Sequence, residues 1–407
     1  MTVKGVIKRL IRIVATVAVF LVLGIAALLG WMWLDHYRET TLPTPTGPYA
    51  VGRITFVWSD AAQTDLLAPP PGTKREIFVW IWYPAAPRQP SQTVDDYLPV
   101  PWRAAIEHQW GVTKFPFRDL SRVRSHGIRG GELSPQQHTY PVILMRGGAA
   151  ALVTGYTSLA EDLASHGYVV VGFDAPYRSS VVVFPDGRVI ARAPQNDVDL
   201  VSGSELEKLA TQLVQAWSAD MVFALDRLER LNTSDPSGKF LGRLDMQRVG
   251  AFGHSLGGAT ALQFCHDDPR CKACIDVDGI PWGSVVREGV TQPVMFLMSD
   301  HGSDSKDAET RMAQENLGSL FDRLPGDRWL EITIRGTDHY MFSDDAVLRS
   351  PVIMRVLRTL GIVGIDGRRQ LAVTEHLIDT FFHVHLNGAP ASELRNQSAY
   401  PEIEYVH

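Results

Sequence analysis

Residues 249–258 read VGAFGHSLGG. An apolar run ends at Phe252, and the next five residues form the pattern G-x-S-x-G. When a strand precedes this pattern and a helix follows it, the chain makes a sharp turn that exposes the serine hydroxyl. Gly253 and Gly257 leave room where a Cβ would collide with the neighbouring chain. We therefore predict that Ser255 is a catalytic nucleophile at the carboxyl edge of a sheet.

Apolar and amphipathic segments alternate on both sides of this turn. Strands are predicted at residues 49–58, 76–83, 142–145, 168–173, 248–252, 273–277, 294–298 and 330–334. Helices are predicted at residues 156–166, 205–231 and 371–386, and from Ser255 onward. Short apolar strands that alternate with helices indicate a mostly parallel, twisted sheet with helices on both faces. Together with the serine turn, this order predicts the α/β-hydrolase fold.

Residues 85–140 lack a regular pattern, apart from a short helical stretch at residues 102–110. A long irregular segment inside a compact domain is uncommon and is often functional. We expect this segment to cover the edge of the sheet or the active site.

The N-terminal segment is basic and then strongly apolar. Lys4, Lys8, Arg9 and Arg12 precede an apolar run at residues 13–34, and about 20 apolar residues span a bilayer. No convincing cleavage site follows, which favours a transmembrane signal-anchor over a cleaved signal peptide. Positive charge before the run keeps the N-terminus in the cytoplasm. We expect a single-pass membrane protein with its catalytic domain on the non-cytoplasmic side, as in a bacterial inner membrane facing the periplasm.

This interpretation divides the chain into five parts. They are a cytoplasmic basic N-terminus (1–12), a transmembrane signal-anchor (13–34), a polar, proline-bearing linker (35–48), an α/β-hydrolase catalytic domain (49–390) and a C-terminal tail (391–407).

Charge and cysteine content exclude other classes of protein. The chain has 407 residues and a net charge of −6, so it has no basic field and nucleic acid is not an expected partner. Cys265, Cys271 and Cys274 are too few for a disulfide framework, although one bridge can form in an oxidising compartment. Too few further ligands accompany them for a zinc site. We expect neither a metal nor an organic cofactor.

A serine hydroxyl needs a base to become nucleophilic at neutral pH. In the predicted fold the chain order is serine, acid, histidine. His339 follows the last predicted strand in the glycine-bearing loop IRGTDH, residues 334–339, from which a base can reach back to the serine. We predict that His339 is this base. His254 is predicted to point elsewhere and to support the site.

The acid that orients His339 is less clearly marked. Asp276 and Asp278 lie at the end of the strand at residues 273–277, and Asp300 follows the strand at residues 294–298. Spacing alone favours Asp278 and Asp300 equally.

An oxyanion hole requires two backbone N–H groups near the serine. Leu256, directly after Ser255, provides one. Arg146-Gly147-Gly148 follows the strand at residues 142–145, and glycine lets the backbone approach a substrate carbonyl closely. Gly148 is our candidate for the second donor.

The sequence resembles the platelet-activating-factor acetylhydrolase family, the plasma and intracellular isoform II type of phospholipase. The likeness extends from about Tyr49 to Leu386. It is carried by EIFVWIWYP at residues 76–84, LASHGYV at 163–169, SLGGAT at 255–260, and ITIRG at 332–336 followed by His339.

The resemblance has two consequences for the site. In this family the aspartate lies at the end of the strand after the nucleophile helix, which selects Asp278 over Asp276 and Asp300. The family usually has His-Gly in the oxyanion loop, where this chain has Arg146-Gly147. Arg146 changes the charge beside the site, and two roles stay open for it: a place on the substrate side, where it favours an anionic leaving group or substrate, or a pairing with a nearby acid.

The resemblance implies a serine carboxylic ester hydrolase similar to 1-alkyl-2-acetylglycerophosphocholine esterase. Such an enzyme cleaves short or oxidised acyl esters of phospholipids through a Ser255, His339, Asp278 triad and an acyl-enzyme. The expected partners are this substrate and the membrane, through the N-terminal helix. Two alternatives stay open: a membrane-tethered esterase for other esters, and a non-catalytic binding protein of the same fold. The complete set of serine, acid and histidine argues against the second.

Overall fold

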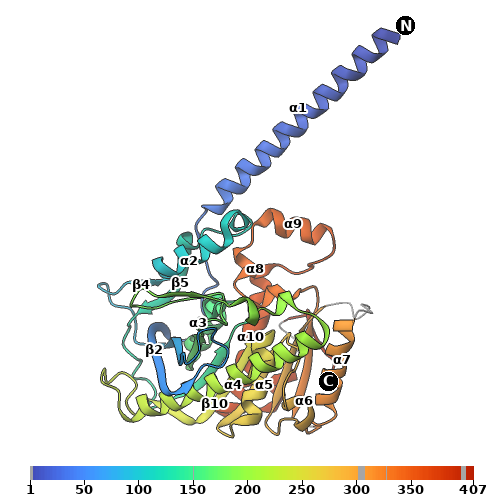
Figure 1. The fold of residues 1–407 in the computed structure, drawn as a ribbon. Coiled ribbons are helices and arrows are strands. Elements are labelled where there is room, and N and C mark those ends of the chain that lie inside the picture. The colour runs from blue at the N-terminus through green and yellow to red at the C-terminus, as the bar shows by residue number, and fades with distance from the viewer. Residues whose placement is uncertain (1–2, 150, 301–307, 327, 396–399) are drawn as a thin grey trace.

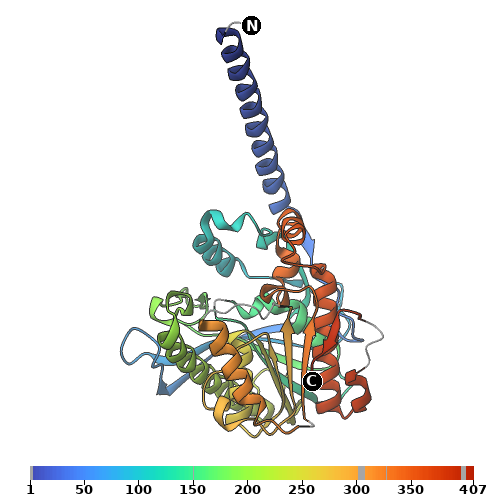
Figure 2. The same ribbon diagram turned by 90° about the vertical axis from the view of Figure 1, so that its right-hand side faces the viewer.

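The structure, a computed structural model, describes residues 3–149, 151–300, 308–326, 328–395 and 400–407. A twisted sheet forms the centre of the globular part, helices cover both of its faces, and one long helix projects away from it (Figures 1 and 2). The α-helices are α1 (Val3–His36), α2 (Val100–Trp110), α3 (Thr157–Ser165), α4 (Gly203–Thr233), α5 (Leu256–Asp267), α6 (Val285–Glu288), α7 (Ala308–Phe321), α8 (Asp345–Leu348), α9 (Pro351–Thr359) and α10 (Gly367–Asn387).

The sheet contains all eight of the predicted strands. The described strands are β1 (Thr40–Thr41), β2 (Ala50–Thr64), β3 (Lys74–Ala85), β4 (Val94–Asp96), β5 (Val123–Arg129), β6 (Tyr140–Arg146), β7 (Val169–Asp174), β8 (Val181–Val183), β9 (Val189–Ala191), β10 (Leu244–His254), β11 (Cys271–Val277), β12 (Val294–Ser299), β13 (Trp329–Ile334) and β14 (Ile403–Tyr405).

Twelve of these strands join in one sheet, in the order β1-β5-β2-β3-β7-β6-β10-β11-β12-β13-β14 with β4 paired to β5. The strands from β7 through β6, β10, β11 and β12 to β13 are parallel to their neighbours. β2, β3 and β7 pair antiparallel at one side, and β14 pairs antiparallel with β13 at the other. The predicted sheet, mostly parallel and covered by helices on both faces, is confirmed.

Strand β3 contributes apolar side chains to both faces of the sheet. Phe78, Trp80 and Trp82 belong to the core on one side, whereas Val79 and Ile81 belong to the core on the other. This division follows the period of two that any strand imposes on its side chains. Because both sets are apolar, β3 is buried on both faces and needs helices on each.

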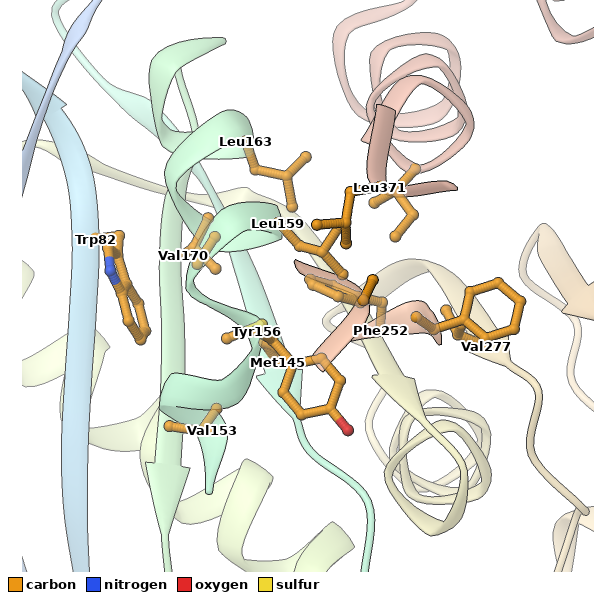
Figure 3. Close-up of a cluster of buried hydrophobic side chains, with 14 of the residues drawn as sticks. Trp82, Met145, Val153, Tyr156, Leu159, Leu163, Val170, Phe252, Val277 and Leu371 are labelled. Carbon is orange, nitrogen blue, oxygen red and sulfur yellow. The ribbon is translucent and has the colours of Figure 1, made fainter. Parts of the chain in front are cut away.

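The two cores lie under different helices. On one face, Leu159 and Leu163 of α3 pack with Leu371 of α10 against the sheet residues Val170 and Phe252 (Figure 3). On the other face, α4, α5 and α7 supply the apolar side chains, among them Met221, Leu228, Leu262 and Leu320. Removal of this apolar surface from water is the main force that holds the helices on the sheet.

The segment at residues 85–140 covers one end of the sheet, as its irregular pattern led us to expect. It contains β4, α2 and β5. Trp102 of α2 packs edge-on against both Phe78 and Trp80, with ring centroids 4.9 Å and 5.3 Å apart. This aromatic contact holds the covering segment on β3.

The segments on both sides of the predicted catalytic domain each contribute a strand to the sheet. Within the predicted linker, β1 pairs with β5 and Leu42 is buried. Within the predicted tail, β14 adds an edge strand to the sheet. Both segments pair because the edges of a sheet carry N–H and C=O groups without partners. A hydropathy pattern does not show this kind of pairing.

Helix α1 extends beyond the predicted apolar run in both directions. Its last residues are bound to the globular part, since Asp35 forms an ion pair of 2.6 Å with Arg118 and both side chains are buried. The stretch Ile7–His36 is long and apolar enough to cross a membrane, and none of its most apolar window is buried. A signal sequence would meet the same criteria.

A disulfide joins Cys265, at the end of α5, to Cys271, at the start of β11. Cys274 is buried and free, so the Cys271 and Cys274 pair that a C-x-x-C pattern would offer does not form. The bridge closes the short loop between a helix and a strand of the central sheet.

Replacing Cys265 and Cys271 together by alanine should lower the free energy of unfolding by about 2 kcal/mol, because the unfolded chain regains the entropy of a short loop. Urea unfolding monitored by circular dichroism measures this. Dithiothreitol should shift the midpoint of the wild-type protein but not that of the double variant. An unchanged wild-type midpoint in dithiothreitol would contradict a stabilising bridge.

Candidate active site

Ser255 occupies a strained turn between β10 and α5. Its φ of 58° and ψ of −128° lie in a region that non-glycine residues rarely adopt. Hydrogen bonds hold the turn: the Ser255 N–H donates to the Val277 carbonyl at 2.8 Å, and the Gly258 N–H donates to the Ser255 carbonyl at 2.8 Å. The neighbouring strand and the first turn of the helix thus keep the serine in this conformation.

The glycines around Ser255 leave no space for a side chain. A Cβ on Gly253 would lie 2.2 Å from the Gly257 oxygen, and a Cβ on Gly257 would lie 2.3 Å from the Arg146 oxygen. A Cβ on Gly258 would lie 1.9 Å from the Asp276 carboxylate. Three backbone segments therefore meet here at distances that only glycine permits.

His339 and Asp278 are joined directly. The His339 Nδ1 lies 2.7 Å from Asp278 Oδ2. Asp278 also accepts hydrogen bonds from the Ser299 N–H and hydroxyl, each at 2.7 Å. Burial alone would raise the pKa of Asp278, but the bonds from His339 and Ser299 outweigh it and hold that pKa below its usual value. The carboxyl group is thus kept as an anion beside the imidazole.

The other two candidate acids have different partners. Asp276 is buried and accepts from the Gly279 N–H at 2.9 Å, and burial raises its pKa. Asp300 accepts from the Gly336 N–H at 2.8 Å. Asp276 therefore supports the turn around Ser255, and Asp300 supports the loop that carries His339.

Two cavities meet at Ser255 and His339. The first has a volume of about 360 Å³, and its wall includes His254 and apolar side chains from α2 and the loops around it: Leu98, Ile106, Trp110, Leu120 and Leu152. The second is lined by Leu256, Asp278, Trp282 and residues of α7. A group bound in the first cavity lies against a largely apolar wall that also includes Ser255.

The two predicted oxyanion donors differ in their surroundings. Leu256 is the first residue of α5, and the first N–H groups of a helix have no partner within it. The Gly148 N–H donates to the Tyr156 hydroxyl at 3.2 Å. The Gly148 Cα is nevertheless close to the serine, since a Cβ there would lie 3.4 Å from the Ser255 Cβ. A carbonyl oxygen that binds Gly148 must share this donor with Tyr156.

Of the two roles left open for Arg146, the position of its side chain does not favour the one on the substrate side. Its side chain is fully buried and lines neither cavity. The guanidinium lies 4.0 Å from the centre of the Trp217 ring, and Nη2 donates to Ser179 at 3.3 Å. Burial lowers the pKa of Arg146 to about 10, although Asp174 acts in the opposite direction. Only the backbone of Arg146 borders the serine turn.

Sequence reasoning missed Tyr156. Its hydroxyl lies 2.7 Å from His254 Nδ1 and accepts from Gly148, and its ring lines the first cavity. In the sequence Tyr156 is only the first residue of a predicted helix, so no local signal marks it. Among the residues that the structure describes, no group of three His, Cys, Asp or Glu side chains is arranged to hold a metal ion.

Residues 35–389 match the family described as platelet-activating factor acetylhydrolase, isoform II. The chain belongs to this family. It is 26% identical over 389 residues to a probable 1-alkyl-2-acetylglycerophosphocholine esterase of Arthroderma benhamiae, a match that covers 90% of this chain and 93% of that protein. It is 24% identical over 351 residues to a platelet-activating factor acetylhydrolase of Cavia porcellus, covering 81% and 74%.

A ferulic acid esterase from Streptomyces cinnamoneus has a similar solved structure, with a TM-score of 0.72 and 27% identity. The match covers 91% of this chain and all of that one. This member of the platelet-activating factor acetylhydrolase isoform II family is therefore an α/β-hydrolase that cleaves carboxylic esters. The non-catalytic alternative is set aside by the esterase relatives.

The crowding at Gly257 can be tested with two glycine substitutions. Gly257→Ala should lower the free energy of unfolding by about 3 kcal/mol, because its Cβ meets the backbone oxygen of Arg146. Gly318→Ala is the matched control: Gly318 also lies in a helix, α7, and has open space around it. That control should be neutral or stabilise by up to about 1 kcal/mol. Equal urea midpoints for the two variants would contradict the close packing at Gly257.

Proposed function

We propose that this protein is a membrane-tethered serine esterase that cleaves short or oxidised acyl esters of phospholipids. Ser255 is the nucleophile, His339 is the general base and Asp278 orients the imidazole. The observation that carries the proposal is the 2.7 Å hydrogen bond between His339 and Asp278, on a histidine that lines the same cavity as the strained Ser255.

In the first half of the reaction, His339 takes the proton of the Ser255 hydroxyl as the oxygen attacks the ester carbonyl. The proton then passes from His339 to the departing alcohol, and the acyl group stays on Ser255. In the second half, His339 removes a proton from water, which attacks the acyl-enzyme and releases the acid. Asp278 stabilises the imidazolium in both halves, and its low pKa keeps it ionised for that role.

The oxyanion of each tetrahedral intermediate is assigned to the N–H groups of Leu256 and Gly148. Leu256 begins α5, so the positive end of the helix dipole also faces the developing charge. Loss of one such donor costs about 10²–10³ in rate in serine hydrolases.

A short acyl chain suits the first cavity. Its volume of about 360 Å³ lies at the small end of ligand pockets and is below the 760 Å³ of the second cavity at the same serine, and its wall is largely apolar where α2 and the neighbouring loops cover it. The esterase of Arthroderma benhamiae is named for an acetyl ester of a phospholipid. These two observations together favour a lipid with a short acyl group.

The membrane assignment rests on α1 and on the surface around its base. We assign α1 as an uncleaved signal-anchor, with residues 1–12 in the cytoplasm and the esterase domain on the other side. Helices α2 and α9 lie at the end of the domain from which α1 projects (Figures 1 and 2). Val356, Leu360 and Ile362, in and after α9, expose more than half of their surface. This apolar edge suits contact with a bilayer.

The disulfide agrees with this topology. Structural disulfides persist in oxidising compartments such as the bacterial periplasm and are rare in the cytosol. The bond between Cys265 and Cys271 therefore favours a domain on the non-cytoplasmic side.

A second candidate function is hydrolysis of esters other than phospholipids. The similarity to a ferulic acid esterase over 91% of the chain favours it. Turnover of 1-alkyl-2-acetylglycerophosphocholine in detergent micelles, compared with methyl ferulate and p-nitrophenyl butyrate, separates the two. Higher kcat/KM for methyl ferulate than for the phospholipid would replace the first proposal by the second.

The triad assignment predicts the outcome of three substitutions. Ser255→Ala should lower kcat for p-nitrophenyl butyrate by about 10⁶-fold and Asp278→Asn by about 10⁴-fold, and Ser255→Ala should abolish labelling by a fluorophosphonate probe. Asp300→Asn, which changes the alternative acid, should keep kcat within about tenfold of wild type. Ser180→Ala, in the wall of the same cavity, serves as a control for the serine. Full activity of Ser255→Ala would refute the assignment.

The signal-anchor assignment predicts that the full chain stays in the membrane pellet after alkaline carbonate extraction and keeps its N-terminus. Mass spectrometry of the purified protein should give the mass of the full chain, 45.1 kDa. Protease added to spheroplasts should digest the esterase domain. A soluble, shorter form would show instead that α1 is a cleaved signal sequence.

A further inference from the structure

We propose that Tyr156 and His254 are positioning residues of the esterase site, which tie the oxyanion loop to the nucleophile turn and support the face of the His339 imidazole. The inference rests on the proposed function of Ser255 and His339. Neither Tyr156 nor His254 has a part in the proton transfers of that reaction, yet both line the cavity that contains the serine.

Tyr156 joins two segments that are far apart in the sequence. Its hydroxyl oxygen accepts from the Gly148 N–H at 3.2 Å and lies 2.7 Å from His254 Nδ1. Both contacts are buried, where a hydrogen bond is strong and an unpaired polar group is costly. Gly148 belongs to the oxyanion loop, and His254 directly precedes Ser255.

The direction of these hydrogen bonds follows from the available protons. A backbone N–H can only donate, so the Tyr156 oxygen accepts from Gly148, and its single proton is then available to His254. Burial, and next the nearby His339, lower the pKa of His254 to about 3. His254 is therefore neutral at physiological pH, and we assign it the tautomer with the proton on Nε2, in which Nδ1 accepts the Tyr156 proton.

His254 extends the connection to the base. The rings of His254 and His339 lie 4.5 Å apart between centroids, at an angle of 39°. Because His254 is neutral, its ring packs against the His339 imidazole without placing a second positive charge beside it. Asp278 binds one edge of the His339 ring, and His254 limits the movement of its face.

The oxyanion loop needs a contact that limits its movement. Gly147 and Gly148 are adjacent, and two glycines in sequence leave the peptide between them free to rotate. The Tyr156 hydroxyl fixes the orientation of the Gly148 peptide, and the Tyr156 ring closes the space beside Gly147, where a Cβ would lie 2.8 Å from Cε2 of the ring. The contacts of Tyr156 thus restrict the movement of a loop that its two glycines leave flexible.

The first experiment compares two losses of a buried tyrosine hydroxyl. Tyr156→Phe should lower kcat for p-nitrophenyl butyrate by about 10- to 100-fold, with KM within about twofold, because the loop is misplaced in the transition state while the cavity wall is kept. Tyr83→Phe is the control: its hydroxyl donates to the Gly131 carbonyl at 2.7 Å outside both cavities, and kcat should stay near wild type. Equal kcat values for the two variants would overturn the proposal.

The second experiment tests His254 and stands even if Tyr156→Phe does not fold. His254→Asn keeps an acceptor near the position of Nδ1, whereas His254→Leu removes it. His254→Asn should retain at least about tenfold more of the wild-type kcat than His254→Leu. Equal losses in the two variants would show that the hydrogen bond from Tyr156 has no part in positioning.

The experiments distinguish failure of the positioning roles from failure of the proposed esterase function. If the wild-type protein hydrolyses the ester and Ser255→Ala does not, the proposed function stands whatever Tyr156→Phe does. If Ser255→Ala keeps its activity, the function fails first, and the positioning roles fail with it.

Discussion

The left-handed backbone conformation of Ser255 is the constraint on which the site depends. A φ of 58° is unfavourable for serine, and it persists because three segments of chain are packed against the turn without room for a Cβ. The Arg146 backbone, the start of α5 and the Asp276 carboxylate provide those contacts. Two of these contacting groups are themselves held in place. The buried guanidinium of Arg146 lies over the Trp217 ring, and Asp276 belongs to the central strand β11.

The parallel arrangement of the strands brings the strained Ser255 together with the other residues of the site. Because β10, β11 and β12 run in the same direction, their carboxyl ends meet at one edge. Ser255 follows β10, Asp278 follows β11, and Ser299 at the end of β12 donates to Asp278. His339 then reaches the same edge from the loop after β13. The helices on the two faces bury the strands that lead to this edge.

One departure from the family pattern lies at the same edge of the sheet. The chain has Arg146 where the family usually has histidine, and the structure buries its side chain against Trp217 and away from the substrate. The oxyanion loop therefore gains no charge from this side chain. The first cavity and the exposed edge near α1 both present apolar side chains.

The sequence by itself determined the fold class, eight of the twelve strands of the sheet and the helices α3, α4, α5 and α10, because hydrophobic period and the serine turn are local signals. It also marked Ser255 and His339 as candidates, and family likeness chose Asp278 among the acids. Only the tertiary structure decided the direction of the Arg146 side chain, the pairing of β1 and β14 at the sheet edges, and the contacts of Tyr156 with Gly148 and His254. These depend on which distant segments meet, and no local pattern records a hydrogen bond between residues that are 98 positions apart.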